Sequence, residues 1–155
     1  MSGTLTQLLS HHRLDTHLAV SSKKRLFEEI SDRIQTDFPD IPARSVFNRL
    51  IAREKLGSTG LGQGIAIPHA RIEGAPDIVG VFFTLDTAID FDAPDNQDVD
   101  LVFALLVPEN EEQEHLNTLA TLAGLFQNAA FCRDIRAADS PEALMVTLAA
   151  WEAKT

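Results

Sequence analysis

The run from Leu101 to Val107 is the feature that most constrains how this chain can fold. It reads Leu-Val-Phe-Ala-Leu-Leu-Val, and Pro108 ends it. A strand with solvent on one face alternates apolar and polar residues, so an almost continuous apolar run predicts a central strand that is covered on both faces. The run Ile78–Leu85 is a second strong strand candidate, and the shorter Ile65–Ile67 is a third.

Helical patterns flank these strands on both sides in the sequence. A short opening helix is predicted near residue 5, a capped helix from Ser21-Ser22, a second from Pro42, a third over residues 111–127 and a last one from Ser140-Pro141. The predicted inward positions are Leu5, Leu8, Leu9, Leu26, Ile30, Ile34, Phe38, Val46, Leu50, Ile51, Leu116, Leu119, Leu122, Ala123, Phe126, Leu144, Leu148 and Trp151. Helices around an apolar strand predict the α/β class, as a sandwich with a mixed β-sheet flanked by helices.

Length and composition predict one domain over residues 1–155. The chain has 45% apolar and 23% charged residues, which is ordinary for a globular protein. No apolar run approaches the roughly 20 residues that span a membrane, and the N-terminus lacks the apolar region of a signal peptide. The single Cys132 cannot form an internal disulfide. We therefore expect a cytoplasmic protein that is not a membrane protein.

The net charge of −10 is distributed unevenly along the chain. No Lys or Arg occurs from Ile72 to Cys132, a span with twelve Asp and Glu residues. Nucleic acid is not expected as a ligand, because phosphate backbones require a basic surface. The acidic stretch is consistent either with a docking surface for a basic protein or with an ordinary solvated surface.

The stretch from Leu56 to Arg71 carries the candidate chemistry. Four of the eight glycines lie within it, followed by a short apolar run, Pro68 and His69. Glycines allow strained turns and close approach to a ligand, and the fixed φ of Pro68 restricts how His69 is presented. This pattern suggests a nucleophilic His69 that meets a phosphoryl group, with a structural histidine after a simple loop as the alternative. The glycines match neither a P-loop nor a dinucleotide-binding fingerprint.

The same residues resemble a known family. The pattern Glu54-x6-Leu61-Gly62-x-x-Ile65-Ala66-Ile67-Pro68-His69-Ala70 is similar to the phosphorylation site of bacterial phosphotransferase-system (PTS) enzyme IIA proteins of the fructose/mannitol type. Residues 53–60 and 91–108 resemble the nitrogen-regulatory branch of that group. The likeness covers nearly the whole chain. The position after the histidine is often Gly in such sequences and is Ala70 here.

The resemblance implies both the fold and the reaction. It implies the compact α/β fold of the mannitol/fructose-type enzyme IIA, in which His69 accepts a phosphoryl group on its tele (Nε2) nitrogen. The donor would be a histidine-containing phosphocarrier protein, itself phosphorylated from phosphoenolpyruvate by an enzyme I. Regulated targets would include potassium-transport and sensor-kinase proteins. No cofactor is expected.

Phosphoryl transfer requires donors around the phosphoryl oxygens and a partner for the second ring nitrogen of the histidine. We expect that partner to be a backbone carbonyl in the glycine loop. Backbone N–H groups of that loop and the hydroxyls of two neighbouring residues are candidate donors, and the residues concerned are Gly57, Ser58, Thr59, Gly60, Gly62 and Gly64. Arg53 has a guanidinium suited to phosphate, although an Arg on a helix surface is the simpler interpretation. The resemblance favours a phosphate contact.

His115 is the second histidine of interest, at the start of the helix after the apolar strand. An exposed helix histidine is the simpler interpretation, whereas the resemblance implies that His115 stabilises the phosphoryl group without being phosphorylated itself.

Other patterns predict no metal site. His11, His12 and His17 have no Cys or carboxylate pattern to complete a site, and the acidic stretch from Asp90 to Asp100 lacks the Gly and Glu of a calcium loop. Cys132 is predicted to be a small core residue.

Three functions follow from these patterns. The favoured one is a nitrogen-regulatory phosphocarrier that acts on proteins rather than on a free small molecule. The alternative is a sugar-specific enzyme IIA that passes phosphate to a IIB partner for fructose or mannitol transport. A plain binding module with an unreactive His69 is the third.

Overall fold

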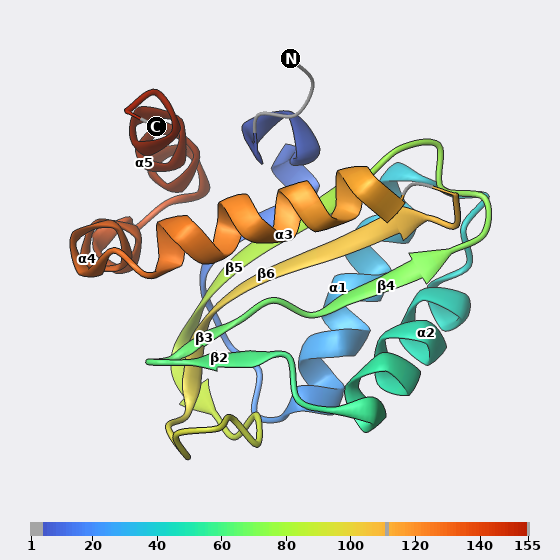
Figure 1. Cartoon of the computed structure of the whole chain (residues 1–155), viewed down its shortest axis with the longest axis horizontal. Coiled ribbons are helices and arrows are strands. Elements are labelled where there is room, and N and C mark those ends of the chain that lie inside the picture. The colour runs from blue at the N-terminus through green and yellow to red at the C-terminus, as the bar shows by residue number, and fades with distance from the viewer. Residues whose placement is uncertain (1–4, 111, 155) are drawn as a thin grey trace.

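The computed structural model describes residues 5–110 and 112–154, and a six-stranded mixed sheet lies at its centre (Figure 1). The strands are β1 (Leu14–Leu18), β2 (Gly60–Gly62), β3 (Ile65–Ala66), β4 (His69–Ile72), β5 (Val79–Ile89) and β6 (Val99–Pro108). The sheet order is β1-β5-β6-β3-β2, and β4 also pairs with β6. β5 is antiparallel to β6, whereas β3 and β4 are parallel to it. The predicted mixed sheet is confirmed.

β6 is buried on both faces, which explains its continuous apolar sequence. Its side chains alternate between two core clusters: Leu101, Phe103, Leu105 and Val107 lie in one, and Val102, Ala104 and Leu106 lie in the other. Successive side chains of a strand point to opposite faces, so each face of the sheet receives its own set.

Helices cover both faces of the sheet. The helices α1 (Lys23–Asp37) and α2 (Ala43–Leu56) pack on one face. The other face is covered by α3 (Glu112–Phe126), α4 (Ala129–Ala137), α5 (Pro141–Glu152) and the 3₁₀ helix η1 (Leu5–Leu8). A second 3₁₀ helix, η2 (His11–Arg13), leads into β1. The predicted caps are present, since the side chains of Ser22 and Ser140 accept hydrogen bonds from the backbone N–H groups of Arg25 and Ala143.

The structure corrects one predicted core position. Leu116 is 57% exposed, whereas its neighbour His115 is 8% exposed. From His115, the inward face of α3 continues through the half-buried Leu119 to the buried Leu122 and Phe126. Successive members of this set are three or four residues apart, as positions on one helix face must be. His115 begins that face, so Leu116 is rotated away from the sheet.

The sequence patterns did not predict β1, β2, β4, η2 or α4. β1 carries Asp15, Thr16 and His17 between its terminal leucines, so it lacks an apolar alternation. α4 has only nine residues, although Asn128 caps it. In the described part of the chain, no helix has both the length and the apolar character needed to cross a bilayer.

Candidate functional site

His69 is the first residue of β4, at an open edge of the sheet. Pro68 interrupts the strand because it has no N–H to donate, yet its carbonyl accepts a hydrogen bond from the Leu105 N–H at 2.9 Å. The register against β6 is unchanged across it, with Ala66 opposite Val102 and His69 opposite Leu105. In the described ranges β2 pairs only with β3, so no further strand covers β4. His69 is therefore fixed by the sheet and remains half-buried at its edge.

A backbone carbonyl sets the tautomer of His69. Its Nδ1 lies 2.9 Å from the carbonyl oxygen of Ile67. A carbonyl only accepts hydrogen bonds, so Nδ1 carries the proton and Nε2 carries the lone pair of the neutral ring. The partner is of the predicted kind, but it belongs to Ile67, which follows the glycine loop.

His115 reaches His69 from α3, on the helix that covers this face of the sheet. The two ring centroids are 5.2 Å apart, and the rings meet edge to face at 62°. His115 is buried, including its Nε2 atom. The sequence places these histidines far apart, and the fold brings them together.

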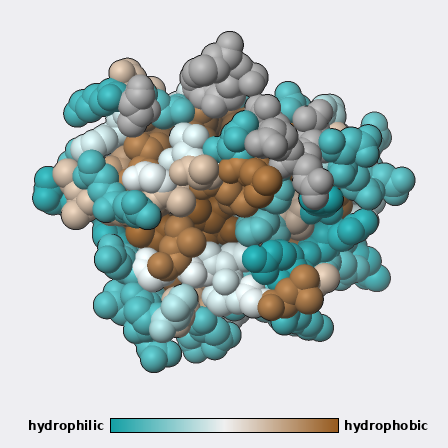
Figure 2. All heavy atoms as spheres, in the orientation of Figure 1, coloured by the Kyte–Doolittle hydropathy of each residue, from teal (hydrophilic) through white to brown (hydrophobic). Residues whose placement is uncertain are grey.

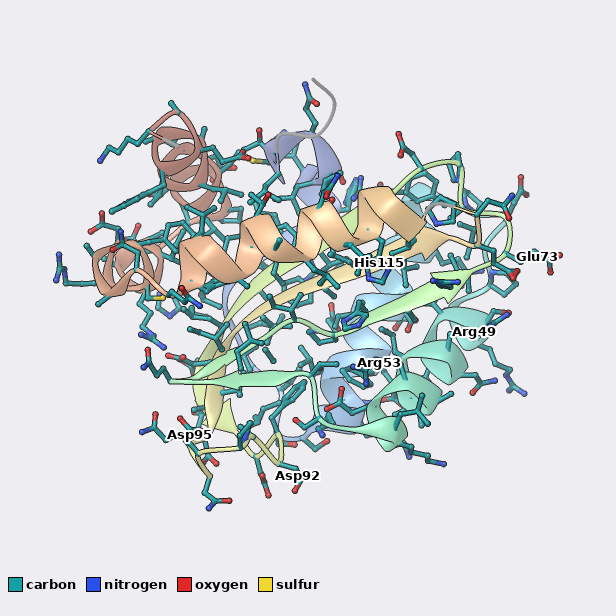
Figure 3. All side chains as sticks on the ribbon, viewed as in Figure 1. Arg49, Arg53, Glu73, Asp92, Asp95 and His115 are labelled. Atoms are coloured by element: carbon teal, nitrogen blue, oxygen red, sulfur yellow. The ribbon has the colours of Figure 1, made fainter. Side chains whose placement is uncertain are left out.

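A pocket of about 400 Å³ opens beside the two histidines. It is lined by Arg49, Ala52, Arg53 and Leu56 of α2, by His69, Ala70 and Arg71 of β4, and by His115 of α3. Figure 3 shows Arg53 on α2 and His115 on α3 on two sides of this region. Arg49 lies nearer the start of α2, on the side of Glu73. Three guanidinium groups thus line one pocket of a chain whose net charge is −10.

The surroundings of His69 favour its neutral form. Burial lowers the pKa of His69 most strongly. The hydrogen bond to Ile67 and the charge of Glu54 raise the pKa, whereas the charge of Arg53 lowers it further. The resulting pKa lies below the ordinary 6.5. Protonation would remove the Nε2 lone pair. The site therefore keeps the imidazole as a nucleophile around neutral pH.

Arg53 also contacts the backbone at the end of its own helix. Its Nη1 donates to the carbonyl oxygen of Gly57 at 2.9 Å, across the last turn of α2. This bond satisfies a carbonyl at the helix end and orients the guanidinium at the pocket that also contains His69. The structure thus brings three of the predicted site residues together: His69, His115 and Arg53.

The glycine loop does not line that pocket. Gly60 and Gly62 form β2, and Gly60 lies against Ala93 so closely that a side chain would meet the Ala93 Cβ at 3.0 Å. Gly64 has a φ of 83° and adjoins Arg136, which a side chain would contact at 2.7 Å. The glycines are required here for the sharp turn and close packing of the β2–β3 hairpin.

The hydroxyls of the loop are also directed elsewhere. Ser58 Oγ donates to the carbonyl of Phe91 at 2.7 Å and accepts from the Gly60 N–H at 3.1 Å. Thr59 Oγ1 donates to a carboxylate oxygen of Glu54 at 2.7 Å. These bonds fix the loop to its neighbours rather than presenting it to a ligand.

Glu54 belongs to the family pattern but was not among the predicted site residues. Its carboxylate side chain is only 6% exposed, pairs with Lys23 Nζ at 2.9 Å and accepts from the backbone N–H of Thr59 at 3.1 Å. Glu54 thereby holds the start of α1, the end of α2 and the loop before β2 together. The sequence shows an acidic residue next to Arg53, but it does not show that this residue is buried. Its burial and its ion pair with Lys23 arise only when α1 packs against α2.

The remaining candidates lie away from His69. His11, His12 and His17 are exposed on η2 and β1, and the described residues contain no cluster of three metal-ligand side chains. In the acidic loop, Asp95 accepts from the Gln63 N–H at 2.7 Å, and Asp100 pairs with Arg136 at 2.9 Å. Cys132 is buried in the core, as predicted, and burial raises the pKa of its thiol.

With this geometry established, comparison with known proteins identifies the family. The sequence pattern of the family described as "Phosphoenolpyruvate-dependent sugar phosphotransferase system, EIIA 2" matches residues 7–151. This chain belongs to that EIIA family. The EIIA protein is therefore a phosphotransfer component of the system.

Similar proteins are nitrogen regulatory proteins. The chain is 42% identical to the "Nitrogen regulatory protein" of Pseudomonas aeruginosa over 140 residues, which is 90% of this chain and 91% of that protein. It is 44% identical to the protein of the same name from Escherichia coli, over 90% of this chain and 86% of that one. These names support the nitrogen-regulatory branch of the family.

Solved structures confirm the fold. Nitrogen regulatory protein IIA-Ntr from Neisseria meningitidis superposes with a TM-score of 0.85 at 41% identity, covering 93% of this chain and 98% of the other. IIA mannitol from Escherichia coli gives a TM-score of 0.71 at 19% identity, covering 90% and 98%. The second likeness shows that the two proteins share the mannitol-type fold.

Proposed function

We propose that His69 is the phosphoryl acceptor of this EIIA protein and that a nitrogen-type, histidine-containing phosphocarrier protein is its donor. The hydrogen bond from Nδ1 to the Ile67 carbonyl is the observation that carries the proposal. It leaves Nε2 as the nucleophilic nitrogen, beside a pocket that contains three arginines. The lowered pKa of His69 supports the same assignment, because the attacking ring has to be neutral.

The transfer exchanges one phosphorus–nitrogen bond for another. The Nε2 lone pair of His69 attacks the phosphorus of the donor's phosphohistidine, and the donor's P–N bond breaks with its electron pair returning to the donor ring. With a proton on its second nitrogen, the donor ring leaves as a neutral imidazole, and the His69 ring takes up the positive charge that the donor ring loses. Nδ1 of His69 keeps its proton and remains bonded to the Ile67 carbonyl throughout. Positioning and charge stabilisation then supply the catalysis.

Two neighbours of His69 would stabilise the phosphoryl oxygens. Arg53 lines the pocket and carries a permanent charge that already acts on the His69 ring. His115 meets His69 edge to face from α3. A guanidinium and an imidazole N–H are both suited to phosphate oxygens in a partly dry site.

The surface around the pocket suits a protein partner. Leu56 is 85% exposed and Leu116 is 57% exposed, and these residues lie on the helices that supply Arg53 and His115. Figure 2 shows apolar side chains gathered across the middle of this face. Exposed apolar residues around a polar site are typical of a docking surface. Phosphorylation would add about two negative charges at its centre, which is sufficient to switch the binding of regulated target proteins.

A reconstituted phosphorylation assay tests the proposed function. Incubation with enzyme I, the phosphocarrier and labelled phosphoenolpyruvate is expected to give one acid-labile, base-stable phosphate on this protein. No label would favour a plain binding module. Addition of purified IIB domains then tests the alternative function, a sugar-specific enzyme IIA. Rapid transfer of the phosphoryl group to a fructose or mannitol IIB domain would indicate a sugar-transport relay instead of a regulator.

The protonation of His69 provides a separate prediction. Its pKa is below the ordinary 6.5, so we expect the ring to stay neutral, with the proton on Nδ1, as the pH falls through that value. Arg53→Gln removes a positive charge and is expected to raise the pKa. Nitrogen-detected NMR titration of the imidazole gives both the tautomer and the pKa. A proton on Nε2 in the neutral ring, or a pKa above that of a free histidine, would contradict the proposed site.

A further inference from the structure

Arg49 lies in the same pocket as His69 but has no role in the reaction described so far. It is four residues before Arg53 on α2, and residues at this spacing share a helix face with Cβ atoms about 6 Å apart. On the opposite wall, His69 and Arg71 are two residues apart on β4 and therefore share a strand face. α2 packs against β4, and all four side chains line the pocket.

The charge of Arg49 is available to a ligand. Arg13, Arg25, Arg33 and Arg136 each pair with a carboxylate. Arg49 is exposed, and it has no hydrogen-bond or ion-pair partner among the side chains that the structure describes, those of residues 5–110 and 115–154. Arg71 already takes part in another interaction. Arg53, the third arginine of the pocket, donates a hydrogen bond to the Gly57 carbonyl at its helix end. Arg49 is therefore the arginine of the pocket whose guanidinium is least engaged by the described protein groups.

The proposed reaction places an unusual demand on this pocket. A phosphoryl group on Nε2 carries close to two negative charges at neutral pH. His115 is uncharged unless it is protonated, so the group requires more positive charge than Arg53 alone provides. A guanidinium one helical turn from Arg53, across the pocket from β4, is placed to supply it.

We propose that Arg49 is a second guanidinium of the phosphoryl site, stabilising the charge on the phosphoryl group as it arrives at His69 and after it is bound. The proposal rests on His69 being the acceptor. It assigns Arg49 to the phosphoryl group itself and not to recognition of the donor protein. Two donors separate these roles, because a small donor has no protein surface for Arg49 to contact.

Phosphoramidate is a suitable small donor. Its P–N bond breaks with the electron pair leaving on ammonia, while the Nε2–P bond of His69 forms. The labelling rate of His69 would be measured with phosphoramidate and, in parallel, with the phosphorylated carrier protein, for the unchanged protein and for Arg49→Gln. Loss of one positive charge from this solvated pocket is expected to slow both reactions about three- to tenfold, and the difference should shrink at high ionic strength.

Arg44→Gln is the matched control. Arg44 is also an exposed arginine of α2, but it lines the groove between α1 and α2 and not the His69 pocket. It removes the same charge from the same helix and should leave both rates unchanged. Arg49→Lys keeps the charge without the guanidinium fork and should fall between Arg49→Gln and the unchanged protein. Arg49→Ala provides a second neutral variant, and unfolding midpoints show that each variant is folded.

The outcomes separate the two proposals. Slowing of both donors by Arg49→Gln and Arg49→Ala, but not by Arg44→Gln, supports a second guanidinium in the phosphoryl site. Equal rates for Arg49→Gln and Arg44→Gln would overturn it while leaving His69 as the acceptor. Slowing with the carrier protein alone would also overturn it, because Arg49 would then act in docking. If the unchanged protein took up no phosphate from either donor, both proposals would fail.

Discussion

His69→Ala is expected to take up no stable phosphate from the phosphorylated carrier protein, whereas His115→Ala should still become labelled. The reason is the nucleophile itself. The Nδ1 of His69 is fixed on a backbone carbonyl, at 2.9 Å from the Ile67 oxygen, and the remaining ring nitrogen lies at an open sheet edge. Alanine removes both nitrogens, and no change of pH or donor concentration can restore a bond to them.

The labelling of the two variants and the unchanged protein would be compared in parallel, with acid and base treatment of the product to identify a phosphohistidine. His69→Gln keeps a polar side chain of similar length and should also remain unlabelled. His11→Ala is the control, since His11 is exposed on η2 and does not line the pocket. Stable label on His69→Ala, or loss of label from His11→Ala, would be incompatible with His69 as the acceptor.

Much of the architecture can be predicted from the sequence because local and long-range signals agree. The apolar run of β6 predicts a strand buried on both faces, and its side chains indeed alternate between two cores. Ser22 and Ser140 mark the beginnings of α1 and α5. β1 was missed because its position depends on parallel pairing with β5, a contact between segments far apart in the sequence.

The candidate site is less predictable than the fold for the same reason. Pro68 and His69 are recognisable in the sequence, but the glycines before them are required by the β2–β3 hairpin and not by the pocket. Arg49 gives no signal of its own, because its position opposite β4 arises only when α2 packs on the sheet. His115 occupies an inward helix position that apolar periodicity assigned to Leu116.

His115→Ala is expected to slow phosphoryl transfer to His69 about a hundredfold without abolishing it. His115 is 8% exposed, and its ring lies 5.2 Å from that of His69, so its loss removes a polar group from a site where little water replaces it. Removing one preorganised donor from such a site costs roughly 10²–10³ in rate in other enzymes. Single-turnover transfer from the phosphorylated carrier protein measures the effect directly.

A purely structural role for His115 predicts a different pattern. The truncation also leaves a cavity under α3, so unfolding midpoints have to be measured alongside the rates. His115→Asn restores a hydrogen-bond donor in a smaller side chain and is expected to recover part of the rate, because the N–H group matters more than the volume. Thr121→Ala, an exposed position farther along α3, should change neither rate nor stability appreciably. Equal rates for His115→Asn and His115→Ala at matched stability would show that the imidazole supports the helix and not the phosphoryl group.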